Sequence, residues 1–378
     1  MTTYKGIRGL TIRTVAGDTS PLLEGDIWYN SVSRKVKGAK TPAGAWSSGT
    51  DLNTARMFLG GVGPATNNLA FSGKPDGTAT WLTVTEAYDG SAWTVVADMS
   101  GGQANFACGG SAESAIVAGG EPGRLANSEE WGGSSWTAGG DLNTARDTLN
   151  GFGASNTAAL ACGGQIPAVQ VITETYDGSS WTEVGDLNLA RGYAPGSSGT
   201  TTAALCFGGA CDTPSPNVMT ALTESWNGAS WTEVNDLNTA RKNGAGAGVQ
   251  PSTLYAGGWS APGTAALDVN ELWNGTSWTE SSELNTGRNG LGGTGNANTA
   301  VLVFGGNTGS ETNKTEAWDG TSWTEVSDLA APSEDFASSA TGGPTAALRA
   351  SGNVSGARSG ATESWTAATY QIKTVTTS

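Results

Sequence analysis

The sequence predicts an all-β protein built from seven repeated units, because aromatic signals recur in phase through most of its 378 residues. One signal is a tryptophan after a small residue, spaced 43 to 50 residues apart: Trp46, Trp93, Trp136, Trp181, Trp231, Trp278 and Trp323. The other is an aromatic residue five positions before the last six: Tyr88, Trp131, Tyr176, Trp226, Trp273 and Trp318. A period in the forties is typical of a β-propeller blade.

Each unit contains signals for four short strands, named a to d in chain order. A Gly/Ala-rich segment after Asp-Leu-Asn-Thr-Ala-Arg supplies strand a, and an apolar run that ends in a small residue and glycine supplies strand b, as in residues 203–209. The two aromatics mark strands c and d. Dipeptides such as Asp89-Gly90 and Asn227-Gly228 follow the first aromatic, which predicts a two-residue turn with φ > 0 at both central residues.

The ring is predicted to close through a strand from the beginning of the chain. Trp46 has no preceding aromatic partner, whereas Trp365 lies in the matching Thr-Glu-Ser-Trp context without a later tryptophan. Strand d of the seventh blade would then come from residues 45–48, which hides sheet edges that could otherwise pair with other chains. We predict a separate N-terminal segment with a hairpin at 1–43 and a seven-bladed propeller at 44–378.

Composition limits the partners. The net charge of −15 argues against nucleic acid, since no basic stripe could displace phosphate counterions. No apolar stretch approaches the ~20 residues of a spanning helix, so we expect no membrane insertion. The four cysteines are expected to be buried thiols rather than a disulfide or metal cluster, because no C-x-x-C spacing occurs.

The absence of histidine argues against catalysis. Histidine-dependent triads and histidine-ligated metals are excluded, and we expect no metal, no cofactor and no catalytic residue. A pair of carboxylates could still hydrolyse a glycan. The acidic residues, however, are mostly repeat elements, which favours structural roles, so the protein is not expected to be an enzyme.

Arginine and glutamate recur once per unit in most repeats. We expect strand c and the start of strand a to bring them together as buried ion pairs that staple each blade, because a buried charge requires a partner; ligand contact is the alternative. The arginines are Arg56, Arg146, Arg191, Arg241 and Arg288, and the glutamates are Glu86, Glu129, Glu174, Glu224, Glu271, Glu316 and Glu363. Two units lack the arginine.

Variation between repeats concentrates in the b–c loops, and loops on a rigid scaffold are where recognition usually resides. Trp81 and Trp259 fall in two of the longer b–c loops, and an exposed indole offers a flat apolar face to a sugar or a protein. The polar candidates beside them are Lys74, Asp76, Asn270 and Thr264. Alternatively, both tryptophans cover the blade edge beneath their own loops.

The order of these signals, arginine, then an apolar run with Gly-Gly, then Glu-x-aromatic, then tryptophan, resembles the kelch repeat over roughly residues 44–365. The resemblance implies a kelch-type propeller.

The first 43 residues do not share the repeat. Residues 25–30 and 34–38 flank Ser-Val-Ser and are expected to form a small hairpin. This segment is similar to N-terminal segments of tailed-phage virion proteins, and the whole chain resembles kelch-type virion proteins of marine tailed bacteriophages. The resemblance implies attachment to the particle and to other virion proteins through residues 1–43. The expected attachment residues are Trp28, Tyr29, Arg34, Lys35 and Lys37.

Together these features indicate a virion accessory protein, decoration or fibre-like, whose propeller binds a host-surface ligand, with a glycan expected. The alternatives are a purely structural virion protein without an external ligand and a free kelch-type binding protein. Exposed Trp81 or Trp259 would favour glycan binding, and a large apolar patch on the propeller side would favour the structural role.

Overall fold

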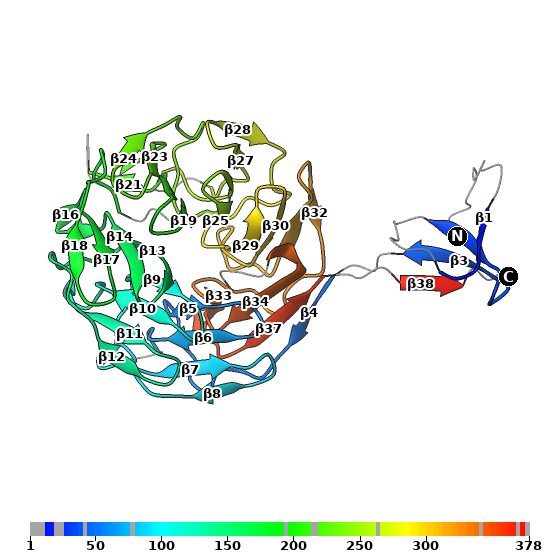
Figure 1. The fold of residues 1–378 in the computed structure, drawn as a ribbon, viewed down its shortest axis with the longest axis horizontal. Coiled ribbons are helices and arrows are strands. Elements are labelled where there is room, and N and C mark those ends of the chain that lie inside the picture. Colours follow the sequence, from blue (N-terminus) through cyan, green and yellow to red (C-terminus); the bar gives the residue numbers. More distant parts are fainter. Residues whose placement is uncertain are drawn as a thin grey trace. The chain divides into compact units, whose positions relative to one another are not determined.

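The computed structural model describes residues 12–18, 26–40, 44–75, 80–192, 196–212, 218–261, 265–339, 343–367 and 371–374. The chain divides into two compact units. The smaller contains Met1–Ala45 and Ala367–Ser378, and the larger is Trp46–Thr366. In Figure 1 the strands of the larger unit form small sheets placed around a common axis.

The larger unit is a propeller of seven four-stranded antiparallel sheets. The a strands are β5 (Gly60–Val62), β9 (Ala107–Gly110), β13 (Asn150–Ser155), β19 (Gly196–Gly199), β25 (Ala245–Val249), β29 (Gly292–Ala297) and β33 (Ala337–Ser338). The b strands are β6 (Asn68–Phe71), β10 (Ala115–Ala118), β14 (Ala158–Cys162), β20 (Ala204–Phe207), β26 (Ser252–Ala256), β30 (Ala300–Phe304) and β34 (Ala346–Ala350).

The outer half of each sheet contains the aromatic pairs. The c strands are β7 (Thr85–Tyr88), β11 (Ser128–Trp131), β17 (Thr173–Tyr176), β23 (Thr223–Trp226), β27 (Asn270–Trp273), β31 (Thr315–Trp318) and β37 (Thr362–Thr366). The d strands are β8 (Trp93–Val95), β12 (Trp136–Ala138), β18 (Trp181–Glu183), β24 (Trp231–Glu233), β28 (Trp278–Ser281), β32 (Trp323–Glu325) and β4 (Ala45–Ser48). A short 3-10 helix, η1 (Gly343–Thr345), precedes β34.

The predicted seven blades and their closure are confirmed. The seventh sheet has the order β33-β34-β37-β4, so its outer strand comes from the start of the chain. Trp46 packs on Trp365 of its own blade and on Phe304 of the sixth, with ring centroids 5.7 and 4.9 Å apart. Two distant parts of the sequence therefore share one sheet.

Apolar side chains fill the space between neighbouring blades. The buried core divides into seven clusters, each drawn from two adjacent blades, including one that joins Leu348 of the seventh blade to Tyr88 and Trp93 of the first. Each blade thus buries its two faces on its neighbours, which explains why a single unit could not form a core alone.

Hydrogen bonds tie each blade to the next. In every blade a glycine lies two residues after the end of strand b. Its backbone N–H donates to the carbonyl of the residue that stands at the arginine position of the following blade. The donor and acceptor pairs are Gly73 and Gln103, Gly120 and Arg146, Gly164 and Arg191, Gly209 and Arg241, Gly258 and Arg288, Gly306 and Ser333, and Gly352 and Arg56. This repeated bond explains why both positions are so regular in the sequence.

The c–d turns differ from the prediction. Strands pair at Tyr88 and Trp93, leaving a four-residue loop, and only Gly90 of the dipeptide has positive φ, at 93°. The Asp89 carboxylate accepts the backbone N–H groups of Ser91 and Ala92, at 2.8 and 2.9 Å. The side chain stabilises the turn without a left-handed first residue, which is typical of Asp and Asn in turns.

The smaller unit contains a mixed sheet. The predicted hairpin is confirmed as β2 (Ile27–Asn30) paired with β3 (Lys35–Lys40). Strand β1 (Arg13–Val15) lies parallel to β2, and β38 (Gln371–Thr374) lies antiparallel to β3. The predicted propeller boundary at residue 378 is therefore wrong, because the chain after Thr366 returns to pair with the N-terminal hairpin.

Candidate ligand-binding face

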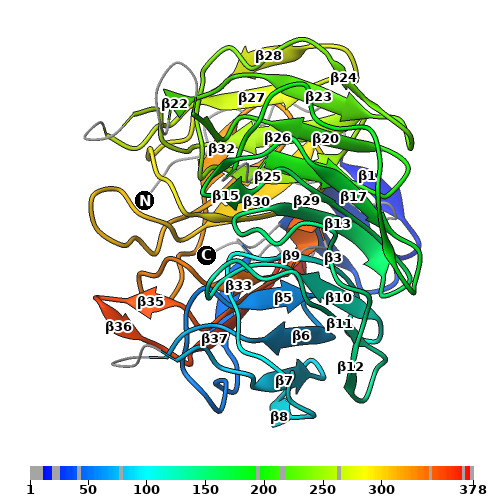
Figure 2. The ribbon, with the colours of Figure 1, turned by 90° about the vertical axis from the view of Figure 1, so that its left-hand side faces the viewer.

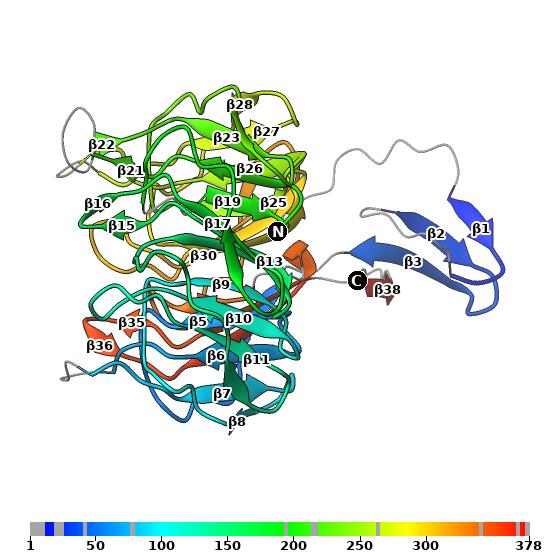
Figure 3. The ribbon, with the colours of Figure 1, turned by 60° about the vertical axis from the view of Figure 1, so that its left-hand side comes forward.

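One face of the propeller bears both the b–c and the d–a connections. Three b–c connections contain small hairpins: β15 (Gln165–Ile166) with β16 (Ala168–Val169), β21 (Ala210–Cys211) with β22 (Val218–Met219), and β35 (Asn353–Val354) with β36 (Ala357–Arg358). Figure 3 shows all three on the same side of the ring, and Figure 2 shows β22 and β36 there from another direction. We call this side the b–c face.

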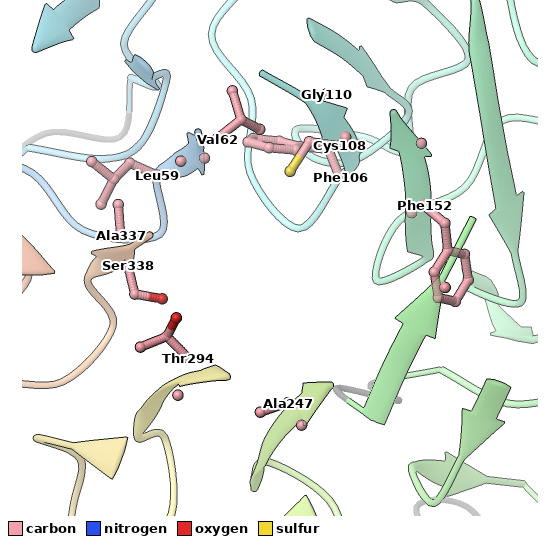
Figure 4. A pocket seen from close by; sticks show the side chains of 18 of the residues that line it. Leu59, Val62, Phe106, Cys108, Gly110, Phe152, Ala247, Thr294, Ala337 and Ser338 are labelled. Carbon is pink, nitrogen blue, oxygen red and sulfur yellow. The ribbon is translucent and has the colours of Figure 1, made fainter. Parts of the chain in front are cut away.

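A channel of about 920 Å³ lies along the axis, lined by the seven a strands. Figure 4 shows Val62, Phe152, Ala247 and Ser338 around it. The described residues of its wall include no charged side chain. Glycine is required where strands approach, since a Cβ on Gly151 would lie 2.6 Å from the backbone nitrogen of Cys108.

The predicted Arg–Glu pairs are present in five blades. Arg146, Arg191 and Arg241 donate to Glu174, Glu224 and Glu271, while Arg56–Glu86 and Arg288–Glu316 are 3.2 and 2.8 Å apart. The side chains of these arginines are fully buried.

Each of these glutamates also fixes the d–a connection. The Glu174 carboxylate accepts the backbone N–H of Asn143 at 2.7 Å and its side-chain Nδ2 at 2.8 Å. Burial lowers the pKa of Arg56 to about 10, which still leaves this guanidinium charged at neutral pH. The pairs therefore hold strand c to the d–a connection and present no charge to a ligand.

The two blades without the repeat arginine hold the strand c glutamate by other contacts. In the seventh blade, Ser333 stands at the arginine position, and Arg349 from β34 reaches Glu363 at 3.9 Å while donating to the Ser333 hydroxyl at 2.9 Å. In the second blade, Gln103 stands there, and Glu129 accepts the backbone N–H of Ser100 at 2.8 Å without an ion pair among the described residues. The sequence motif did not reveal Arg349, because this arginine lies on a different strand.

The two loop tryptophans are half-buried and each lies under a lysine. The Lys74 ammonium is 5.3 Å from the Trp81 ring centroid, and the Lys242 ammonium is 5.8 Å from that of Trp259. The predicted Lys74–Trp81 neighbourhood is thus present, whereas Lys242 beside Trp259 was missed. Asp76 and Thr264 lie outside the described residues.

Asn270 does not belong to this face. It is the first residue of β27 and is fully buried, so its assignment to the ligand site is wrong. In the other blades this position holds a threonine or a serine, whose hydroxyl accepts the indole N–H of the d-strand tryptophan in the next blade. Thr223, for example, accepts from Trp278 at 2.9 Å. A residue counted in the loop thus lies in the interface between blades.

Two positions per blade lie on the b–c face, where strand b has ended and the d–a connection leads into strand a, and we call them the rim. One directly follows the arginine position and the other follows the glycine pair, and they form a backbone bridge in every blade. The bridges are Met57–Lys74, Ala104–Glu121, Asp147–Gln165, Gly192–Ala210, Lys242–Trp259, Asn289–Asn307 and Glu334–Asn353. Of these, only Lys74 and Trp259 were predicted as candidates, although the variability between two regular positions was visible in the sequence.

The expected attachment residues divide by exposure. Trp28 is only 1% exposed, with its indole N–H 3.3 Å from Asp18, so it belongs to the interior of the smaller unit rather than to a contact surface. Arg34 and Lys35 are exposed at the hairpin turn, whereas Tyr29 and Lys37 are half-buried.

Within the described part of the chain, no three Cys, Asp or Glu side chains are arranged to hold a metal ion. The four cysteines are free thiols, and three of them are buried. No helix among the described residues is long and apolar enough to span a bilayer.

No protein-family model and no curated protein sequence matches this chain. Solved structures do resemble it. The structure of YjhT matches with a TM-score of 0.56 and 13% identity, over 73% of this chain and 98% of that chain. A fungal alcohol oxidase of the AA5 family, in complex with copper, matches with a TM-score of 0.65 and 15% identity, over 86% of this chain and 77% of that chain. At such identities the similarity concerns the fold alone, and the larger unit is a seven-bladed kelch-type propeller like YjhT.

Proposed function

We propose that this protein is a bacteriophage virion accessory protein, whose smaller unit attaches it to the particle and whose propeller binds a host-surface glycan without chemical conversion. The observation that supports binding most strongly is the contrast between repeats. The strand c glutamate recurs as a buried residue in all seven blades, whereas the two rim positions carry a different residue pair in every blade. A scaffold with a variable face is the usual arrangement of a recognition module.

The placement of the carboxylates favours recognition over hydrolysis. The repeat glutamates are buried and bonded to the backbone of the d–a connections. The turn aspartates are similarly engaged, as in the bond from Ser179 N–H to Asp177 at 2.9 Å. Groups already used to hold the scaffold are poor candidates for a general acid or base.

Glycan as the ligand class is supported by the half-exposed indoles of Trp81 and Trp259 on the b–c face. A flat indole can stack on the apolar face of a sugar ring while neighbouring polar groups bond its hydroxyls.

Attachment through the smaller unit is supported by its separate fold and by the resemblance of its sequence to virion proteins. Its hairpin turn exposes Arg34 and Lys35, which contrast with the acidic propeller and suit an acidic docking surface.

Cryo-electron microscopy of the source particles tests this proposal. Particles carrying the full chain should show a seven-bladed disc, and particles carrying a chain without residues 1–43 should lose it. Discs that persist after the truncation would contradict attachment through this segment, and intact particles without any disc would contradict the virion assignment.

A purely structural role without an external ligand is less well supported. The exposed large apolar side chains of the described propeller are Phe58, Val95 and Val249, which lie two residues before β5, at the end of β8 and at the end of β25. Scattered single residues of this kind do not form the contiguous patch of a packing interface.

A further inference from the structure

We propose that the rim of blades five to seven is a subsite for a neutral sugar, with Trp259 as the stacking surface and Asn289, Asn307 and Glu334 as the hydrogen-bonding groups. This inference rests on the proposed glycan-binding function and specifies the place and the ligand class.

The first argument is the residue chemistry around the rim. Blade four contributes only Gly192 and Ala210, blade five contributes Lys242 and Trp259, and blades six and seven contribute amides and a carboxylate. An aromatic surface followed by acceptor and donor groups is the combination that sugar recognition requires, because sugars expose both C–H faces and hydroxyls.

The second argument is continuity. The carbonyl of Asn243, next to Lys242, accepts the N–H of Gly290 at 2.8 Å, which places the rim residues of blades five and six side by side. Asn289 donates to the Asn307 carbonyl at 3.3 Å, and Asn307 Nδ2 donates to Glu334 Oε2 at 2.9 Å. The three polar side chains therefore form one connected surface across two blades.

The third argument is the place of the indole beside the polar groups. The backbone N–H of Gly258 donates to the carbonyl of Arg288 at 2.9 Å, so Trp259 and Asn289, which follow these residues, are neighbours on blades five and six. The Lys242 ammonium lies 5.8 Å from the centroid of the Trp259 ring. The stacking residue and the amide of blade six are therefore adjacent on the rim.

The fourth argument is charge. Glu334 lies beside Asp335, and Glu311 of the preceding blade accepts from Asn353 at 3.0 Å in the same polar network. Burial and the Glu334 charge raise the pKa of Asp335 to about 6. Arg358 also lies here, with Nη1 3.4 Å from Asn353 Oδ1. These three carboxyl groups, Glu334 on the rim and Asp335 and Glu311 beside it, accept from hydroxyl donors but repel carboxylated or sulfated sugars, which favours a neutral glycan.

The test measures binding of the full chain to three sets of immobilised oligosaccharides: neutral glucans, mannans and galactans; sialylated, uronate and sulfated glycans; and chitosan oligomers. We expect affinity for at least one neutral glycan. Preference for an anionic or cationic set would overturn the ligand class.

Variants locate the subsite. Trp259→Ala should weaken binding of the neutral glycan by about tenfold or more, Trp259→Phe should retain part of the affinity, and Asn289→Ala should weaken it severalfold. Val249→Ala, at an exposed apolar residue near the opposite end of the channel, is the control and should bind as the wild type does. Melting temperatures of all variants check that the fold is intact.

The outcomes distinguish a failure of the proposed subsite from a failure of the proposed glycan binding. Neutral-glycan binding that is unaffected by both rim substitutions would overturn the subsite while leaving glycan recognition standing. A wild-type chain that binds no glycan in any set would overturn the proposed function together with the subsite.

Discussion

The indole of a d-strand tryptophan forms the same bond in six of the seven blades, to a hydroxyl on strand c of the preceding blade. The donors and acceptors are Trp46 and Thr315, Trp93 and Thr362, Trp136 and Thr85, Trp181 and Ser128, Trp231 and Thr173, and Trp278 and Thr223. At the remaining junction Asn270 replaces the hydroxyl, and within the described structure neither the Asn270 side-chain oxygen nor the Trp323 indole N–H has a hydrogen-bond partner. Buried unsatisfied groups of this kind destabilise the folded state.

Asn270→Thr should therefore stabilise the protein by about 1–2 kcal/mol, because it supplies the missing hydroxyl to Trp323. The matched reverse change, Thr223→Asn, removes the acceptor of Trp278 and should lower stability by a similar amount. Chemical denaturation of both variants measures the effect. A destabilised Asn270→Thr would show that this junction relies on the asparagine.

Asp335→Asn should change the dependence of stability on pH. The folded-state pKa of about 6 lies above the ordinary 3.8, mainly because of burial and then because of Glu334, so the folded protein loses stability as pH rises from about 4 to above 6. The substitution removes this loss, and we expect a gain of about 1–3 kcal/mol at pH 8 and little change at pH 4. Asn105 and Asn243 already occupy the equivalent left-handed position, with φ of 53° and 58°. Equal gains at both pH values, measured by denaturation, would contradict a titration effect.

Individual residues were the hardest part to predict from the sequence. Asn270 was counted in a loop because strand c begins one residue before the recurrent glutamate, a boundary that the pattern does not mark. Arg349 was missed because a long arginine side chain can bring its guanidinium to the glutamate from a different strand. The position of an arginine in the repeat therefore does not identify the partner of the glutamate. Trp259, in contrast, was identified because it stands outside the aromatic pattern.

At the scale of the elements, the buried ion pair links strand c to the d–a connection. Glu174→Gln should lower stability by about 3–5 kcal/mol, because Arg146 would remain buried without its counter-charge. Glu129→Gln in the second blade, where Gln103 replaces the arginine, should cost about 2 kcal/mol less. Thermal unfolding compares the two. Equal losses would mean that the backbone bonds, rather than the ion pair, determine the stability.

The strands were predictable because their signals recur seven times, so an ambiguous unit could be aligned with clear ones. Turn geometry was not, since Asp-Gly fits both a two-residue turn and the observed four-residue loop, and the side-chain bonds of Asp89 decide between them. The rim was overlooked for a related reason: bridge partners such as Asn289 and Asn307 acquire meaning only when strands a and b are placed next to each other.

At the scale of the molecule, closure depends on β4. A chain lacking residues 1–43 and 367–378 retains β4 and should remain monomeric with a melting temperature near that of the full chain. Removal of residues 1–48 instead should expose the edge of β37 and remove Trp46 from its contacts, causing aggregation or a large loss of stability. Light scattering and thermal unfolding compare the two truncations, and indistinguishable behaviour would contradict the role of the clasp.

The pairing of β38 with β3 could not have been predicted locally, because it joins segments more than 330 residues apart. The predicted propeller is nevertheless correct in blade number and in the origin of its last strand. The recurring aromatics fix the number of blades, whereas they say nothing about the residues before the first blade and after the last one.

The central claim is that repeated residues build the propeller while the rim of blades five to seven binds the ligand. A crystal structure of the full chain soaked with the neutral glycan of highest affinity tests this most directly. The account predicts a sugar ring stacked on the Trp259 indole within hydrogen-bond distance of Asn289, Asn307 or Glu334. A sugar bound at the opposite end of the channel, near Val249, or on the smaller unit with the rim empty would contradict it.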